Sequence, residues 1–159
     1  MDLNACRPVI DALERAPAII VPMVREVPES ILRRSPMAGK WSAHEHACHL
    51  AAVQPLFFQR LDLMLEQDHP TMRPYLPDRD DPEDALLKVD LADALERFQR
   101  ERARLVERVR SLRAEHWDRT AEHGEYNRYS VFILFRHVAM HDMLHAYRIE
   151  ELLLKKDWD

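Results

Sequence analysis

The chain has 159 residues, a formal net charge of -5, 32% charged residues and only 2 glycines. This length fits one domain with a sizeable core, and the shortage of glycine favours helix. A mildly acidic chain lacks the basic stripe that a nucleic-acid backbone requires, so we expect no nucleic-acid partner. Two isolated cysteines indicate a reducing compartment. Neither a signal-peptide pattern nor an apolar run of about 20 residues occurs, so we expect a cytoplasmic protein without membrane contact.

The first predicted helix spans about Pro8 to Glu26. Apolar residues recur along one of its faces at helical spacing: Val9, Leu13, Ala16, Ile20 and Val24. Proline lacks a backbone N–H and its ring crowds the preceding turn. Pro17 and Pro22 therefore predict a kink or two shorter pieces. A polar connector from 28 to 40 follows.

The second predicted helix begins at a capping box, in which Ser42 caps the first turn and Glu45 reaches back. It continues to about Gln67, with an apolar stripe facing inward. Pro55 lies inside it and predicts a bend just beyond His49. The stretch 69–84 is rich in proline and aspartate and poor in apolar residues, which is typical of a crossover loop.

Two further helices are predicted in the second half, over about 84–112 and 130–154, joined by a polar loop at 115–128. No strand pattern is convincing between the helices. Four helices with two long connections indicate an all-α four-helix bundle with long crossover connections, formed by residues 1–159 as a single domain.

Histidines on the last helix are the strongest sign of chemistry. At about 100° per residue, His145 lies about 30° from the centre of the apolar stripe and His141 about 70° from it. His137 lies more than about 100° away, on the flank. Two inward imidazoles one turn apart are either core histidines with separate hydrogen-bond partners or two ligands of one metal ion. A metal ion satisfies both at once, whereas unpaired buried polar groups cost roughly 1–3 kcal/mol each.

The second helix offers three more histidines. His44 falls on the polar face beside the cap, where we expect it to be solvated. His46 lies near the centre of the apolar stripe and His49 at its edge, about 70° away. Periodicity slightly favours His46 as a third ligand and does not decide between the two.

The pattern Trp41-Ser42-x-x-Glu45-x-x-x-His49-Leu50, followed by His141-Asp142-x-x-His145, resembles the DinB-like (DinB/YfiT) superfamily. The resemblance covers essentially the whole chain. It implies a four-helix bundle whose divalent metal (Zn, Ni, Fe or Mn) is held by His49, His141 and His145. The family commonly has an apolar residue at position 46, so His46 is a departure: either a fourth nitrogen near the site or a histidine bonded to backbone.

The resemblance also implies a function. Some relatives are transferases or isomerases that use a low-molecular-weight thiol, and others look like metal-dependent hydrolases. We therefore expect a metal-dependent enzyme that acts on a small molecule by thiol transfer or hydrolysis, and a homodimer. The alternative is a non-catalytic dimeric bundle with a structural or adventitious metal.

Three charged residues are candidates for supporting roles. Asp142 lies about 30° from the centre of its stripe. It would orient a ligand histidine or act as general base, unless it bonds a loop backbone. Arg148 is a candidate for an anionic cofactor or substrate group, although a solvated or ion-paired arginine is the commoner outcome. Arg102 occupies a position where the helical periodicity predicts an apolar core residue. Its guanidinium either points toward a thiol cofactor's carboxylate or extends to solvent.

Overall fold

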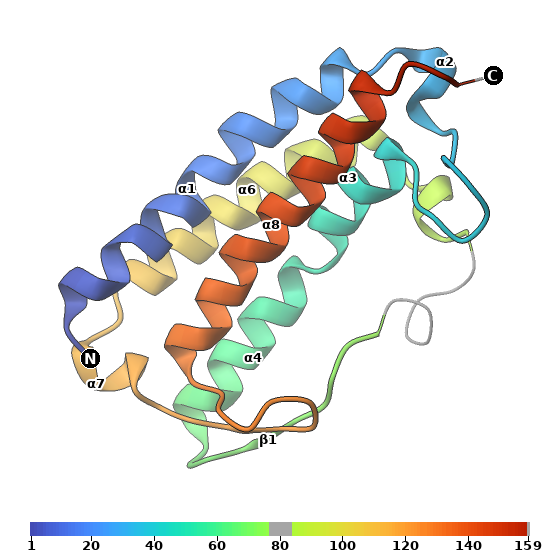
Figure 1. Ribbon diagram of the computed structural model, residues 1–159. Coiled ribbons are helices and arrows are strands. Elements are labelled where there is room, and N and C mark those ends of the chain that lie inside the picture. Colours follow the sequence, from blue (N-terminus) through green and yellow to red (C-terminus); the bar gives the residue numbers. More distant parts are fainter. Residues whose placement is uncertain (77–83, 159) are drawn as a thin grey trace.

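The computed structural model describes residues 1–76 and 84–158, and it shows a four-helix bundle (Figure 1). The long helices are α1 (Leu3–Glu26), α3 (Ala43–Ala52) continued by α4 (Gln54–Glu66), α6 (Leu91–Arg110) and α8 (Val131–Leu154). Helices α6 and α8 each pack against both α1 and α3. The predicted fold class is therefore confirmed.

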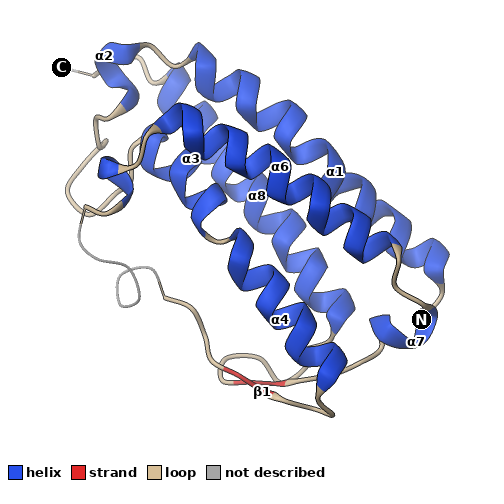
Figure 2. Ribbon diagram, turned by 180° about the vertical axis from the view of Figure 1, so that it is seen from behind, coloured by secondary structure: helices blue, strands red, loops and turns tan. Residues whose placement is uncertain are grey.

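The connections are long because consecutive helices do not always alternate in direction. Helix α4 ends at one end of the bundle and α6 begins at the opposite end (Figures 1 and 2), so a long connection is needed between them. Residues 77–83 of the crossover loop predicted over 69–84 lie outside the described residues. Short elements lie in the connections: α2 (Glu29–Leu32), the 3-10 helix η1 (Leu86–Lys88) and α7 (Ala114–Trp117). Strands β1 (Thr71–Met72) and β2 (Glu122–His123) pair in parallel. The expectation of loops without strands was wrong at this point, because two residues per strand leave no readable alternation.

Helix α1 is continuous from Leu3 to Glu26, so of the predicted kink or division the division into two pieces was wrong. Pro8, Pro17 and Pro22 all lie inside it. Pro17 cannot donate to the carbonyl of Leu13 four residues earlier. Arg102 Nη1 on α6 instead donates to that carbonyl oxygen at 3.5 Å. A neighbouring helix thus supplies a donor where the proline removes one.

The second predicted helix is divided where Pro55 predicted a bend. Val53 ends α3 and starts α4, and Pro55 stands in the first turn of α4. The side chain of Gln54 donates from Nε2 to the carbonyl oxygen of Leu50 at 2.7 Å. The capping box at Ser42 and Glu45 is present, with Ser42 N donating to Glu45 Oε2 at 2.8 Å.

The third helix starts at Leu91, later than expected, because residues 86–88 form η1 and Asp90 caps α6 by accepting from Asp93 N at 3.0 Å. The last helix has the predicted bounds, with Ser130 as its N-cap. None of the helices in the described part of the chain is long and apolar enough to cross a membrane.

The bundle interior consists of two apolar clusters, one toward each end. One cluster contains Leu13, Phe57, Leu105 and Phe135, and the other contains Ile20, Leu50, Phe98 and Ile149. The buried polar residues near mid-bundle belong to neither: His49, Gln54, Arg102, Asp142 and His145. They form a polar layer, at the level where α3 gives way to α4.

Candidate metal centre

Three histidines from two helices converge in the polar layer. His49 Nε2 on α3 lies 3.1 Å from His141 Nε2 on α8, and His145 Nε2 lies 3.1 Å from the same atom. One ligand atom from each of the three residues lies within 4.8 Å of the others. The structure thus brings together the three histidines that the resemblance implied.

The donor set and its spacing fit a divalent metal. Two nitrogens of a tetrahedral site with metal–nitrogen bonds of about 2.0–2.1 Å stand about 3.3 Å apart, close to the 3.1 Å separations seen here. The second nitrogens, His49 Nδ1 and His141 Nδ1, are buried and have no hydrogen-bond partner among the described residues. Among the described residues, no hydrogen bond at these two atoms holds either ring in another orientation.

Burial keeps the His49 and His145 imidazoles neutral, which is the form that binds metal ions. Burial, together with a smaller effect of the neighbouring histidines, lowers the pKa of His49 to about 3 and that of His145 to about 2. An indole ring covers one side of the cluster, with the Trp41 centroid 4.8 Å from that of His49 and 5.9 Å from that of His145. His49 and His145 are therefore held in a largely dry environment, whereas His141 is 30% exposed.

His46 contacts His145 and lies outside the cluster of three nitrogens. Its Nδ1 is 2.8 Å from His145 Nδ1. If His145 Nε2 is a ligand, its proton sits on Nδ1, so His145 donates to His46 Nδ1. Burial lowers the pKa of His46 to about 4, which keeps it a neutral acceptor. His46 is thus a fourth nitrogen near the site, the first of the two expected roles, and it orients a candidate ligand.

The other two expectations for histidines have different outcomes. His44 was expected to be solvated, and this was wrong: it is fully buried and its Nε2 donates to the carbonyl oxygen of Leu86 at 3.1 Å. The 3-10 helix η1 packs against α3 and covers it. His137 stays on the flank, where its ring lies 5.1 Å from that of Tyr126.

Asp142 and Arg102 form a buried ion pair across the polar layer. The side chains are 0% and 1% exposed, and both carboxylate oxygens accept from the guanidinium, Oδ1 from Nη2 at 3.1 Å and Oδ2 from Nη1. Arg102 Nε also donates to Gln54 Oε1 at 3.2 Å. Arg102 therefore neither extends to solvent nor faces a pocket. Asp142 Oδ1 lies 3.9 Å from His141 Nδ1.

Arg148 lies on the exposed surface of α8, where it pairs with Glu151 at 2.6 Å. It also lines a groove on the side of His46, together with Lys40, Trp41 and Lys155. The structure thus places Arg148 near the histidines but outside their cluster.

Comparison with known proteins decides the family. Residues 12–149 match the sequence profile of the DinB superfamily. The chain belongs to the DinB superfamily. YfiT from Bacillus subtilis, described as a probable metal-dependent hydrolase with an unusual four-helix bundle topology, has a similar structure. The TM-score is 0.84 at 22% sequence identity, covering 96% of this chain and 87% of YfiT. No curated protein sequence matched.

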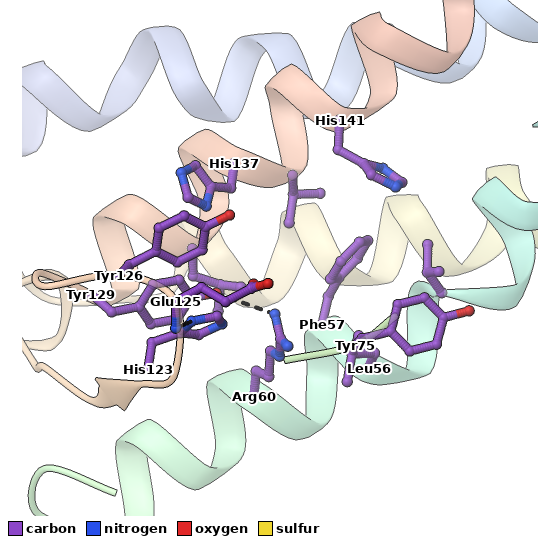
Figure 3. Close-up of a pocket in the computed structure, with 13 residues that line it drawn as sticks. Leu56, Phe57, Arg60, Tyr75, His123, Glu125, Tyr126, Tyr129, His137 and His141 are labelled. Carbon is purple, nitrogen blue, oxygen red and sulfur yellow. Dashed lines mark hydrogen bonds between the residues drawn. The ribbon is translucent and has the colours of Figure 1, made fainter. Parts of the chain in front are cut away.

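This DinB-superfamily protein has a pocket of about 300 Å³ next to His141 (Figure 3). Its walls come from α4, α8 and the connection that contains β2. The polar side chains that line it are Arg60, Tyr75, His123, Glu125, Tyr126, Tyr129 and His137. Sequence reasoning identified none of these as a site, because they come together only through the pairing of β1 with β2 and the packing of the loops. The one local feature of the sequence that could have indicated this pocket is the close spacing of Tyr126 and Tyr129 just before α8.

The buried ion pair leads to a stability prediction. Asp142→Asn leaves the Arg102 charge uncompensated in the interior, so we expect the free energy of unfolding to fall by about 3–5 kcal/mol. Arg108→Gln removes the exposed pair between Arg108 and Asp62, and there we expect less than about 1 kcal/mol. Urea denaturation of both variants measures the difference. Equal losses in the two variants would contradict the prediction that the buried pair contributes more to the free energy of unfolding than the exposed pair does.

The neutral imidazoles lead to a pH prediction for the metal-free protein. The folded-state pKa values of His49 and His145 are depressed to about 3 and about 2, so below pH about 6.5 the unfolded chain takes up protons that the folded chain does not. We expect the free energy of unfolding to be constant above that pH and to fall as the pH is lowered toward 4.

The matched variants are His145→Gln and, at an exposed position, His69→Gln. Removing one such histidine should reduce the slope by up to about 1.4 kcal/mol per pH unit, and His69→Gln should leave it close to that of the wild type. Denaturation curves between pH 7.5 and 4.5 give the slopes. A slope that is unchanged in His145→Gln would argue against a neutral buried ring.

Proposed function

We propose that His49, His141 and His145 hold one divalent metal ion and that the protein is a metal-dependent enzyme acting on a small molecule. The observation that carries this proposal is the convergence of three imidazole nitrogens, two of them 3.1 Å from the third, beside a pocket. Three protein ligands leave room for a further ligand, as in catalytic sites, whereas structural sites are usually closed by a fourth protein group.

A divalent metal in this position supplies Lewis acidity, lowering the pKa of water to near 7 or holding a thiolate. The residues around it hold the donors in place. His46 accepts from His145 Nδ1, and Trp41 covers the rings. The pocket approaches the cluster through His141, which is a lining residue and is 30% exposed.

We infer that Asp142 acts as a positioning residue. Both of its oxygens accept from Arg102 and the side chain is completely buried, so it is not placed to take a proton from a molecule in the pocket. Its Oδ1 lies 3.9 Å from His141 Nδ1, which has no other partner among the described residues. A carboxylate near the second nitrogen of a ligand histidine favours the tautomer that binds metal.

Hydrolysis is the first candidate reaction, because YfiT, which shares the fold, is described as a probable metal-dependent hydrolase. Transfer of a low-molecular-weight thiol is the second. The groove next to His46 supports it, since Lys40, Arg148 and Lys155 line it with Glu151 as the one carboxylate. Such a groove would suit the anionic part of a thiol cosubstrate, with Arg148 as one contact.

The expected homodimer stays a prediction. Large apolar side chains are exposed on one face of α8, and a second copy of the chain would cover them: Met140, Met143, Leu144 and Tyr147.

Metal binding is the first test. Protein purified without a histidine tag is expected to bind about one equivalent of divalent metal, because three histidines converge on one point. His141→Ala is expected to lose it, since two remaining imidazoles hold a metal poorly. His137→Ala, one turn earlier on the same helix, is the matched control and should retain it. Elemental analysis after dialysis measures the content. Less than about half an equivalent in the reconstituted wild type would contradict the proposal.

The reaction class is tested with metal-loaded protein and an activated ester, p-nitrophenyl acetate. For a hydrolase we expect product without any thiol, and a rate in His141→Ala that equals the rate of metal-free wild type. Addition of free cysteine should then change the rate little. Product that forms only when the thiol is present would favour transfer over hydrolysis, and no metal-dependent rate under either condition would favour the non-catalytic bundle.

A further inference from the structure

The pocket beside His141 contains a cation that no carboxylate in the described part of the chain neutralises. Arg60 projects from α4 into the middle of the pocket (Figure 3). Its Nη1 donates to the Tyr129 hydroxyl at 3.3 Å, and its Nη2 donates to the carbonyl oxygen of Arg73 at 3.0 Å. By contrast, Arg102, Arg108 and Arg148 each pair with a carboxylate. The Arg60 side chain is thus anchored by neutral groups while its charge remains available.

Aromatic rings form much of the pocket wall. Phe57 and Tyr75 lie to one side of Arg60 in the view of Figure 3, and Tyr126 and Tyr129 lie to the other. Tyr126 and Tyr129 are nearly parallel, with an interplanar angle of 7° and centroids 6.2 Å apart. A pocket of about 300 Å³ lies at the small end of ligand sites and suits a flat apolar body.

Two of the histidines that line the pocket, His123 and His137, add no positive charge near neutral pH. Burial lowers the pKa of His123 and of His137; the positive charge of Arg60 adds to the effect at His123, and those of Arg136 and Arg60 add to it at His137. Both rings are therefore neutral hydrogen-bonding groups near neutral pH. Glu125 is the one carboxylate that lines the pocket; it is exposed and forms no ion pair with Arg60 in the described part of the chain.

We propose that Arg60 and Tyr129 bind the carboxylate of a small, flat, apolar substrate whose body extends along the aromatic wall toward His141. A guanidinium and a hydroxyl are matched donors for a carboxylate, and charge-assisted hydrogen bonds of this kind are the stronger ones. The reaction at the His141 end rests on the proposed function, but binding of the carboxylate does not need the metal. A monoanion is favoured over a dianionic phosphate, because Glu125 repels negative charge and the pocket is small.

Benzoate is the probe, and benzamide is its neutral counterpart of the same shape. Titration calorimetry on metal-free protein is expected to show benzoate binding at least about tenfold more tightly than benzamide. Arg60→Gln should weaken benzoate binding by at least about tenfold. Arg60→Lys should weaken it by less, because lysine keeps the positive charge although it lacks the paired N–H donors of the guanidinium. Arg15→Gln, the same charge change on the exposed surface of α1, should leave the affinity unchanged. Glu125→Gln should bind benzoate at least as tightly as the wild type.

Two results would overturn the assignment. One is equal affinity of the wild type for benzoate and benzamide, which needs no variant. The other is an unchanged benzoate affinity in a folded Arg60→Gln protein. If Arg60→Gln does not fold, the Arg60→Lys variant and the wild-type comparison decide. Tighter binding of phenyl phosphate than of benzoate would overturn the choice of a carboxylate.

His145→Ala separates this inference from the proposed function. It removes a candidate ligand that does not line the pocket. We expect the variant to lose metal and keep benzoate binding. A wild type that binds metal without benzoate refutes the pocket assignment alone, and one that binds benzoate without metal refutes the metal centre alone.

Discussion

The buried pair of Arg102 and Asp142 is the interaction on which the interior depends. From α6, Arg102 reaches a carbonyl of α1, the side chain of Gln54 at the start of α4 and the carboxylate of α8. Arg102 therefore connects all four helices of the bundle at one level. One of these acceptors is free because of a proline: Pro17 leaves the Leu13 carbonyl without its helical donor. Gln54 lies at the break before Pro55, where its amide nitrogen donates to the Leu50 carbonyl and its amide oxygen accepts from Arg102. At both prolines a side chain donates to a backbone carbonyl near the break: Arg102 to Leu13, and Gln54 to Leu50.

The same pair fixes how α8 is rotated. With Asp142 pointing at the bundle axis, His141 lies about 100° and His145 about 60° to the same side of it. That side faces α3, where His49 is carried at the last turn before the break. Because the carboxylate cannot leave its partner without a large cost in stability, α8 cannot turn the two histidines away from His49. The order of residues in His141-Asp142-x-x-His145 thus combines a structural anchor with two ligand donors, and the anchor determines where the donors point.

Periodicity and local chemistry predicted much of this arrangement. The capping box at Ser42, the division near Pro55, the inward direction of His141 and His145 and the four helices all follow from short-range pattern. What failed were features decided by a partner distant in the sequence. His44 is buried because η1 covers it, and Arg102 is buried because Asp142 and Gln54 accept its hydrogen bonds. His46 and His49 were hard to separate because both point into the polar layer, one toward His145 Nδ1 and the other toward His141 Nε2. A single helix carries no information about which of its inward side chains meets which acceptor.

The distribution of charge connects the polar layer with the pocket. Arg102 and Asp142 cancel each other within the interior, so neither contributes net charge to the space around the histidines. Burial keeps His46, His49 and His145 uncharged. Among the described residues that line the pocket, the charge that a ligand meets therefore comes from Arg60, partly offset by Glu125, and it would be joined by any cation that the three imidazoles bind. A divalent ion would have no carboxylate ligand in the cluster of three histidines to reduce its charge. Metal and Arg60 would then act in the same direction and favour an anionic ligand between them, because attraction between charges strengthens where water is excluded.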